Sequence, residues 1–347
     1  MASKITIIPE FLPFLRLFLH SQIFRTPQFP TQSFVGQTII VTGANVGLGL
    51  EAARHFYRLN CDKLILAVRT VSKGEVAKED IVRTIKERTD ASAIEIWELD
   101  LSSTASTIAF SERVNKELDR VDVLVENAGI NTKTFVVSEN TEQTMQVNVL
   151  NTFLLALLLL PKLTETSKVV DSEPHLTIVT SEAHHLTKFP QVNSEDIYKS
   201  LNDKKSFSGQ SSYEISKLIE ILFIRELLSR LSAKTQAEPA VVVTLVNPGL
   251  CVSTLATRDK TSAVMKAVLA IAMKLVARTT EVGSRTLVLG AAVGMTSHGE
   301  YMSDGENQKV EGWIYTDVGK EVQKKVFEQT MRVLELRKPG IGEAIGL

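Results

Sequence analysis

Runs of apolar, often β-branched residues alternate with longer helical segments between residues 37 and 250. Strands are expected at 38–41, 63–68, 93–99, 121–125, 176–180 and 240–246. Helices are expected at 48–59, 73–88, 104–118, 142–163 and 212–231. Continuously apolar strands that are separated by helices indicate a parallel sheet covered on both faces. The alternation therefore predicts an α/β fold with one doubly wound, Rossmann-type sheet of about seven strands.

Length, charge and cysteine content narrow the classes of protein further. The 347 residues contain no Pro-, Gly- or Ser-rich linker, so we expect one domain over residues 36–340 after a leader of residues 1–35. The formal net charge of −1 argues against a nucleic-acid partner. Cys61 and Cys251 are too few for a disulfide framework, which favours a cytoplasmic location. The adjacent His184 and His185 lack further ligands at metal-binding spacing, so no metal is expected.

The leader is apolar over residues 5–24, but Pro9, Pro13 and Arg16 interrupt it. A spanning helix needs about 20 mainly apolar residues, and a secretory signal needs an unbroken apolar core. We therefore expect a short helix that either packs on the body or lies on a membrane surface, and we favour packing. The apolar run 153–160 is also too short to span, and it predicts a buried helix or a contact between subunits.

A glycine-rich turn follows the first expected strand and opens into a helix, with the sequence TGANVGLG at 42–49. Glycines allow the tight turn, let the backbone approach a pyrophosphate, and direct amides of the helix N-terminus at the phosphates. The strand before and the helix after distinguish this turn from an ordinary glycine-rich loop. The residues expected to contact a dinucleotide are Gly43, Asn45, Gly47, Leu48 and Gly49.

The end of the second expected strand indicates which nucleotide binds. Dinucleotide folds place an acid there for the ribose hydroxyl of NAD, whereas a cation accommodates the 2′-phosphate of NADP. This chain has Arg69 and Lys73 at that place and no acid between them. Cations form charge-assisted hydrogen bonds with phosphate, so we expect NADP(H) as the cofactor.

Four polar residues form a candidate catalytic group. Tyr213 and Lys217 are four residues apart on an expected helix and therefore share a face. An ammonium lowers a phenol pKa from its ordinary value of about 10, which permits proton exchange near neutral pH. Ser181 ends an expected strand, at the edge where open α/β sheets bind ligands. Asn148 lies on the helix after the fourth strand.

The glycine turn and these four residues, in this order, resemble the short-chain dehydrogenase/reductase family over residues 33–336. The resemblance implies that Ser181 polarises a substrate carbonyl and that Tyr213 exchanges the hydroxyl proton. It also implies that Lys217 lowers the tyrosine pKa and binds the nicotinamide ribose, and that Asn148 orders a water of a proton relay. The cofactor supplies the hydride.

The same resemblance implies further cofactor contacts. Residues 126–129 read ENAG where the family has NNAG, so Glu126 puts in doubt the hydrogen bonds that the first Asn makes inside the sheet. The segment after the sixth strand resembles the one that contacts the nicotinamide carboxamide. Besides Tyr213 and Lys217, the cofactor-binding residues implied in this way are Asp100, Leu101, Asn127, Ala128, Gly129, Pro248, Gly249, Val252 and Ser253.

Several segments, including SEAHH at 181–185 and GEYMSDG at 299–305, resemble the retinol-dehydrogenase-like branch of this family. They are most similar to its fungal members, many of which act on secondary metabolites. We expect residues 182–211 to line the substrate pocket. The apolar segment 250–278 is expected to form a lid, with an oligomer contact or a membrane patch as alternatives.

These expectations describe an NADP(H)-dependent oxidoreductase that interconverts a ketone or aldehyde and an alcohol on a bulky, apolar small molecule. A second class of function fits the same fold, namely an isomerase, cyclase or dehydratase that binds the cofactor. A third is a non-catalytic nucleotide sensor, against which the complete group of four residues argues.

Overall fold

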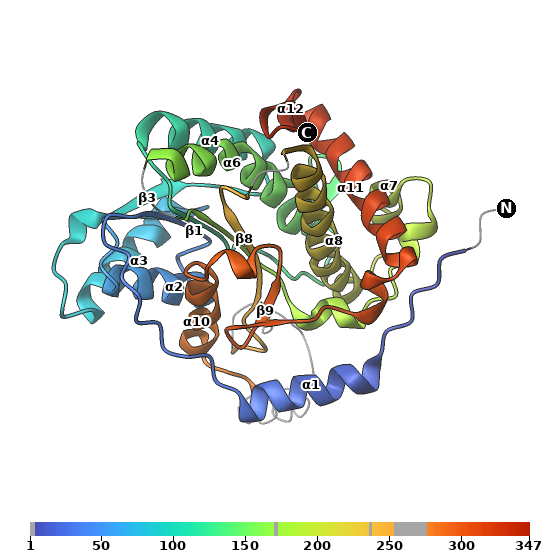
Figure 1. The fold of residues 1–347 in the computed structure, drawn as a ribbon, viewed down its shortest axis with the longest axis horizontal. Helices are drawn as coiled ribbons and strands as arrows, with labels where there is room; N and C mark the ends of the chain where they lie inside the picture. Colours follow the sequence, from blue (N-terminus) through green and yellow to red (C-terminus); the bar gives the residue numbers. More distant parts are fainter. Residues whose placement is uncertain (1–3, 170–172, 236–237, 253–275) are drawn as a thin grey trace.

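The computed structural model describes residues 4–169, 173–235, 238–252 and 276–347. Within them the chain builds an eight-stranded sheet in the order β10-β9-β8-β7-β4-β1-β2-β3 (Figure 1). Its strands are β1 (Thr38–Thr42), β2 (Lys63–Val68), β3 (Ile94–Glu98), β4 (Val123–Glu126), β7 (His175–Val179), β8 (Val242–Asn247), β9 (Tyr301–Ser303) and β10 (Glu306–Gln308). All of them run parallel except β10, which pairs antiparallel with β9 at one edge. The predicted fold class is confirmed.

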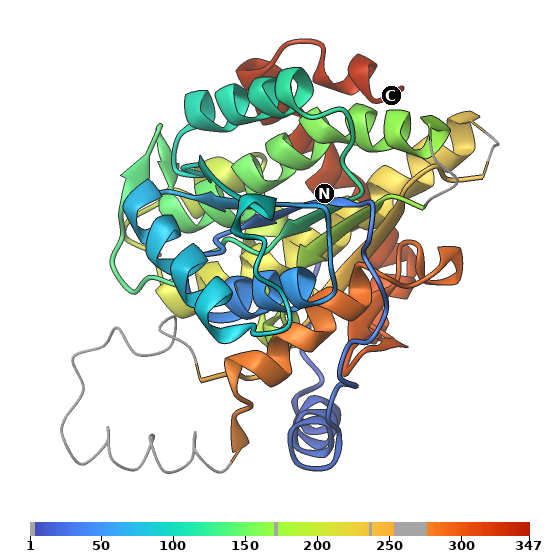
Figure 2. The same cartoon turned by 90° about the vertical axis from the view of Figure 1, so that its left-hand side faces the viewer.

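Helices cover both faces of the sheet (Figure 2). One layer contains α2 (Gly47–Arg58), α3 (Val71–Thr84) and α10 (Thr280–Gly290). The other contains α4 (Thr104–Glu117), α6 (Thr152–Val169) and α8 (Gly209–Thr235), with α11 (Asp317–Arg337) packed on α8. The shorter elements are α5 (Gln143–Met145), α7 (Ile197–Leu201), α12 (Ile341–Ala344), the hairpin strands β5 (Val137–Ser138) and β6 (Thr141–Glu142), the 3₁₀ turns η1 (Ala91–Ala93), η3 (Glu182–Leu186), η4 (Pro190–Asn193), η5 (Met295–Ser297) and η6 (Gly312–Tyr315), and the π-helix η2 (Gln146–Asn151).

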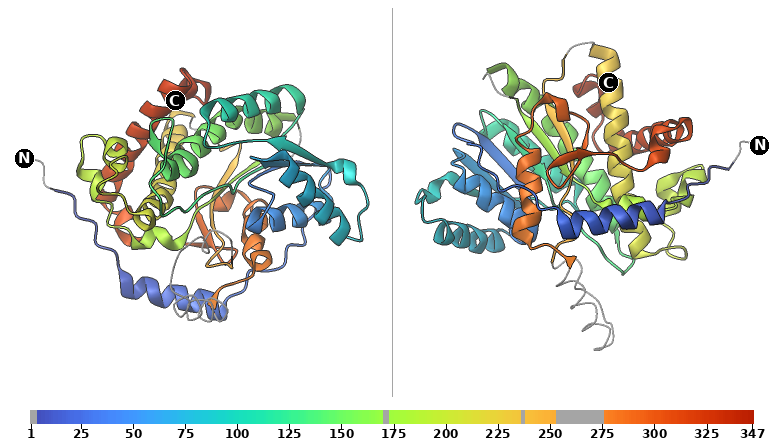
Figure 3. Two further views of the ribbon diagram at one scale, coloured as in Figure 1. Left: turned by 180° about the vertical axis from the view of Figure 1, so that it is seen from behind. Right: turned by 60° about the horizontal axis from the view of Figure 1, so that its bottom comes forward.

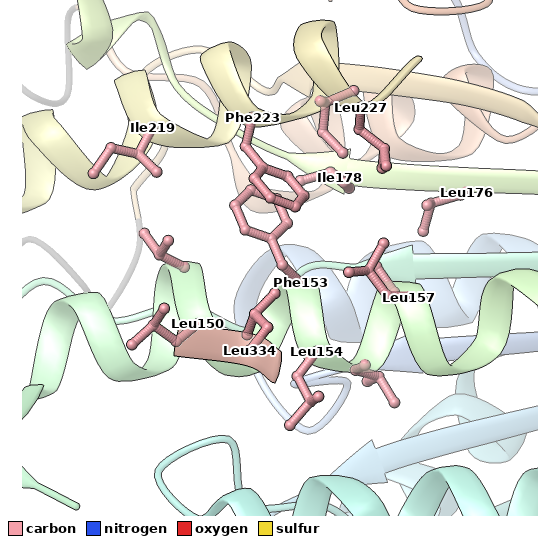
Figure 4. Packing of buried hydrophobic residues seen from close by; sticks show 14 of the residues in the cluster. Leu150, Phe153, Leu154, Leu157, Leu176, Ile178, Ile219, Phe223, Leu227 and Leu334 are labelled. Atoms are coloured by element: carbon pink, nitrogen blue, oxygen red, sulfur yellow. The ribbon is translucent and has the colours of Figure 1, made fainter. Parts of the chain in front are cut away.

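Two apolar cores lie on the two faces of the sheet, because successive strand residues point to opposite sides. Ile40 belongs to the core under α4, α6 and α8, whereas its neighbour Ile39 belongs to the core under α2, α3 and α10. In the first core the rings of Phe153 on α6 and Phe223 on α8 stack with centroids 4.0 Å apart, next to Ile178 of β7 (Figure 4). Burial of each such ring stabilises the fold by roughly 1.5–3 kcal/mol.

The expected helix 142–163 is interrupted in the structure. Its first part is α5, its middle is the π-helix η2, and only α6 is regular. The Thr152 hydroxyl donates to the carbonyl of Val147, five residues earlier, at 2.8 Å, which suits the wider π turn. By length and hydropathy residues 143–168 could span a membrane, but 72% of the most apolar window is buried in the fold. The helix is therefore part of the protein core, as expected.

The leader forms α1 (Phe11–Phe24), which crosses the molecule outside both helical layers (Figure 3). The buried Ser21 attaches its C-terminal end, donating to Asp304 Oδ1 at 2.8 Å and accepting from Arg278. The Phe14 ring stacks on His185 at 5.5 Å. The opposite side of α1 is exposed, including Leu12 and Ile23. The helix therefore contacts the body through one side and presents apolar side chains on the other.

Candidate functional site

The glycine turn joins β1 to α2. Gly47 begins α2 with a φ of +63°, and no atom lies within 4 Å of the position that a Cβ would occupy there. Gly49 is tightly packed, because its Cβ would lie 2.4 Å from Asn127 Nδ2 and 2.6 Å from the carbonyl oxygen of Gly43. The N-cap residue Val46 offers no side-chain acceptor to the first amides of α2. These amides, the helix dipole and the open space at Gly47 suit the pyrophosphate of a dinucleotide.

Thr42 ties this turn to the end of β4. Its Oγ1 accepts hydrogen bonds of 2.9 Å from the backbone amides of Asn127 and Ala128. The Asn127 side chain donates back to the Thr42 carbonyl at 2.8 Å. Asn45 and Leu48 lie in the same turn and are partly exposed. The structure thus brings the two expected cofactor segments, 42–49 and 126–129, side by side.

The cations that are expected to select NADP follow β2, the strand that pairs with β1. Gly43 donates its amide to the carbonyl of Ala67 at 2.8 Å, so the end of β2 lies beside the glycine turn. Arg69 follows β2 directly, and Lys73 lies in the first turn of α3. Both are exposed, which leaves their charges free to meet a phosphate.

Asp100 and Leu101 follow β3, next to β2 in the sheet. The Asp100 carboxylate accepts from the amide and hydroxyl of Ser102 at 2.9 and 2.8 Å. Leu101 is buried, and its carbonyl accepts from Asn151 Nδ2 at 2.8 Å. These bonds fix the loop, and the partly exposed Asp100 lies at the carboxyl edge of the sheet, where open α/β sheets bind ligands.

Ser181 and Tyr213 meet at the carboxyl edge of the sheet. Ser181 follows β7 and caps η3, where its hydroxyl accepts from the Ala183 amide at 3.2 Å. Tyr213 lies in the second turn of α8 and is partly exposed. The Ser181 hydroxyl lies near enough to the Tyr213 phenol to lower its pKa. Two neighbouring hydroxyls can bind one carbonyl oxygen and exchange a proton with it.

Lys217 lies one turn further along α8 and is buried. Its ammonium is 5.7 Å from the centre of the Tyr213 ring, and it donates to the Val179 carbonyl at 2.9 Å and to Glu220 Oε1 at 2.8 Å. Burial raises the pKa of Tyr213, and the opposing effect of Lys217 is smaller. The net shift of the phenol pKa is therefore opposite to the one expected from the YxxxK spacing alone, because burial outweighs the effect of Lys217 and Glu220 raises the pKa further.

Asn148 lies within the π-helix η2 and is buried. Its side-chain amide brackets the backbone of Ile130, accepting from the amide at 2.8 Å and donating to the carbonyl at 2.9 Å. It also donates to the Ser216 hydroxyl at 3.1 Å, and Ser216 in turn donates to the Tyr213 carbonyl. Gly129 lies beside it, since a Cβ there would be 3.4 Å from Asn148 Oδ1. A wide turn of this kind is frequent at functional sites.

The Pro248–Gly249 turn follows β8 and is held by residues that sequence reasoning missed. The buried Asn247 accepts from the amides of Gly249 and Glu182 at 3.1 and 3.3 Å, so it joins the turn to the residue after Ser181. Arg278 donates to the carbonyl of Pro248 at 3.3 Å. The asparagine directly before Pro-Gly was the available signal, whereas nothing local pointed to Arg278.

The last expected contacts are only partly described. Val252 follows the turn and is exposed, while Ser253 lies outside the described residues. The expected lid is described only at 250–252 and 276–278, so most of it falls outside them as well. His184 Nδ1 donates to the Ser181 carbonyl at 2.8 Å, and His185 Nδ1 pairs with Glu311 Oε1 at 2.9 Å. No metal-binding group of three or more side chains occurs among the residues that the structure describes.

Comparison with known proteins agrees with this geometry. The family model of short chain dehydrogenases matches residues 37–171. The chain is 41% identical over 328 residues to short chain dehydrogenase/reductase dmxR8 of Cryptosporiopsis sp., covering 93% of this chain and 98% of that protein. It is 39% identical over 329 residues to short-chain dehydrogenase anuD of Penicillium roqueforti, covering 94% of this chain and 84% of that protein.

The fold is also similar to a solved structure, a short chain dehydrogenase from Shigella flexneri complexed with NADP. The TM-score is 0.54 at 20% identity, with 80% of this chain and 100% of that chain covered. The sheet order, the glycine turn and the two full-length relatives lead to one conclusion. The chain belongs to the short chain dehydrogenase family.

Proposed function

We propose that this protein interconverts a ketone or aldehyde and an alcohol on a bulky, apolar small molecule, with NADP(H) as the hydride carrier. The observation that carries the proposal is the Lys217 ammonium 5.7 Å from the centre of the Tyr213 ring, with Ser181 beside the phenol at the carboxyl edge of the sheet. Family membership supports an oxidoreductase, and the site geometry supports the reaction class.

The residues have separate tasks in this proposal. Ser181 holds the substrate oxygen and polarises the carbonyl, while Tyr213 donates a proton to that oxygen in reduction and accepts it in oxidation. Lys217 places positive charge behind the phenol. Asn148 fixes the wide turn of η2 against the Tyr213 end of α8 through Ser216. When it is bound, NADPH supplies the hydride.

The choice of NADP(H) is supported by charge. The open space at Gly47 and the first amides of α2 would hold the pyrophosphate, and the exposed Arg69 and Lys73 would meet the 2′-phosphate. The similar Shigella flexneri protein was solved with NADP. Residues 69–73 contain no acidic side chain, and an acid at this place would favour NAD.

The substrate class rests on the segment between Ser181 and Tyr213. A small cavity lies at the start of α8, and its lining is mostly serine, with Leu201, Phe207 and Ile215 as its apolar members. The Phe207 ring packs edge-on against Phe135 at 5.3 Å, which adds an apolar contact to this segment. Resemblance to fungal members supports a secondary metabolite as the natural substrate.

The proposal is tested by incubating the purified protein anaerobically with NADPH and a panel of bulky aromatic and alicyclic ketones. We expect consumption of NADPH in step with alcohol formation. Tyr213→Phe should abolish most of this turnover, whereas Tyr315→Phe, which removes the same atom from an exposed tyrosine, should not. Product formation without loss of NADPH would instead indicate an isomerase, cyclase or dehydratase and would contradict the proposal.

A further inference from the structure

A pair of buried acids lies behind the candidate active site. Glu126 ends β4 and Glu220 lies on α8, and each is 2% exposed. Glu220 Oε1 accepts from the Lys217 ammonium at 2.8 Å. Glu220 Oε2 and both carboxyl oxygens of Glu126 are buried and have no hydrogen-bond partner in the described part of the chain. These acids are not explained by cofactor binding or by the roles assigned to Ser181 and Tyr213.

The charges of this group do not balance if both acids are ionised. Lys217 supplies one positive charge, and two carboxylates would leave a net negative charge in a buried place, which costs several kcal/mol. Burial raises the pKa of Glu126 well above its ordinary range, and the charge of Glu220 raises it further. Burial raises the pKa of Glu220 too, but the Lys217 ammonium opposes this shift, whereas Glu126 has no ammonium partner among the described residues. Glu126 is therefore the acid that keeps its proton, while Glu220 carries the charge.

This pairing changes what Lys217 can do for Tyr213. A free ammonium beside a phenol stabilises the phenolate. Here the ammonium is bound by Glu220 and by the Val179 carbonyl. The charged groups that act on the phenol are Lys217 and Glu220 from α8 and Glu182 from η3, and both acids oppose its ionisation. Glu126 on β4 acts on Glu220.

We propose that Glu220, with protonated Glu126 behind it, is a positioning residue that fixes Lys217 and keeps Tyr213 as a neutral phenol near neutral pH. The inference rests on the proposed function, because it assigns that phenol the task of proton donor. A neutral phenol is ready to give a proton to a carbonyl and is a poor acceptor for the proton of an alcohol. The acid pair leaves the reaction equilibrium unchanged, but it makes reduction fast near neutral pH and oxidation fast only at higher pH.

The first test follows ionisation of Tyr213 without any substrate. The tyrosinate absorbance of wild type minus Tyr213→Phe isolates one of the five tyrosines during a pH titration. Glu220→Gln should move this ionisation to lower pH by at least about one unit, because the ammonium then acts on the phenol without its carboxylate partner. Glu220→Asp keeps the charge, so Tyr213 should ionise close to its wild-type pH in this variant. An unchanged titration in Glu220→Gln would overturn the proposal.

The matched control is Glu214→Gln. Glu214 is also a buried acid on α8, but its carboxylate accepts from Gln210 Nε2 at 2.6 Å, and no bond to Lys217 is formed. Removal of the Glu214 charge should leave the pH at which Tyr213 ionises unchanged. A shift equal to that of Glu220→Gln would show a general effect of charge on the helix and would refute a specific role for Glu220.

The second test detects the proton on Glu126. Glu126→Gln replaces a neutral acid with a neutral amide of the same shape, so the variant should fold and should keep its melting temperature at neutral pH. The infrared spectrum should lose a protonated-carboxyl band relative to wild type. An unchanged carboxyl region would mean that Glu126 is ionised and would refute the proposal.

These readouts separate the inference from the proposed function. If Tyr213→Phe retained full ketone reduction, the proposed function would fail whatever the titrations showed. If Tyr213→Phe were inactive while Glu220→Gln titrated as wild type does, the positioning role alone would fail.

Discussion

Asp304→Asn removes one charge from the buried network that attaches α1. Arg278 and Asp304 form an ion pair in which both side chains are 4% exposed. Asp304 has a φ of +60°, a backbone conformation that Asn tolerates as well as Asp, so the substitution changes the charge and little else. The remaining acceptors of Arg278, which are the carbonyls of Ser21, Arg25 and Pro248 and the Ser21 hydroxyl, are neutral. The guanidinium would then stay buried without a hydrogen-bonded counter-charge.

Leaving one partner of a buried ion pair unpaired costs about 3–5 kcal/mol. For 347 residues the entropy of unfolding is about 0.7 kcal/mol per kelvin, so the melting temperature should fall by about 4–7 °C. Scanning calorimetry at neutral pH measures this shift. Arg278→Met combined with Asp304→Asn should recover part of the loss, because no unpaired charge remains.

Asp317→Asn is the control for this experiment. Asp317 pairs with Lys320 at 3.3 Å on a fully exposed surface, and such pairs contribute little to stability. Its melting temperature should match that of wild type. If Asp304→Asn had the same melting temperature as Asp317→Asn, the argument that a buried network holds α1 in place would be refuted.

Three further predictions concern the site and the leader. Tyr213→Phe should lower turnover by about 10²–10⁴-fold and leave NADPH affinity nearly unchanged in a calorimetric titration, since only the phenol oxygen is lost. NADPH should bind at least about tenfold more tightly than NADH, or about 1.4 kcal/mol, and Arg69→Asp should reverse the preference; equal affinities in wild type would contradict the assignment. Because Ser21 holds α1 on the body, the full-length chain should stay in the supernatant with sedimented anionic liposomes, and pelleting that is lost without residues 1–30 would show a membrane contact.

The sequence predicted the part of the fold that has a strong local signal. The strands β1 and β2 are continuous apolar runs bounded by polar turn residues, and their observed ends differ from the expected ones by one residue at most. The strands β9 and β10 were not expected, because three residues are too short to show a period. The π turn at Gln146–Asn151 was also missed, since its apolar pattern matches that of an ordinary helix.

The candidate site was predictable where one motif carries the chemistry. The structure brings Ser181 near Tyr213, and the glycine turn follows β1 in the same sheet, while their roles stay predictions. The charged and polar residues around the site were not predictable, because residues far apart in the sequence meet only in the folded chain. Arg278 and Ser21 are 257 residues apart in the sequence, and the burial of Glu126 beside Glu220 depends on the packing of α8 against the sheet.

Transfer of deuterium from NADPH that carries deuterium at both hydrogen positions of the nicotinamide C4 tests the central claim most directly. The labelled cofactor is incubated with a ketone from the panel, and the alcohol is analysed by mass spectrometry and NMR. We predict that each product molecule carries one deuterium on the former carbonyl carbon and that none of it exchanges with water, because the hydride passes directly from cofactor to substrate. Product that carries only solvent hydrogen at that carbon would contradict the account.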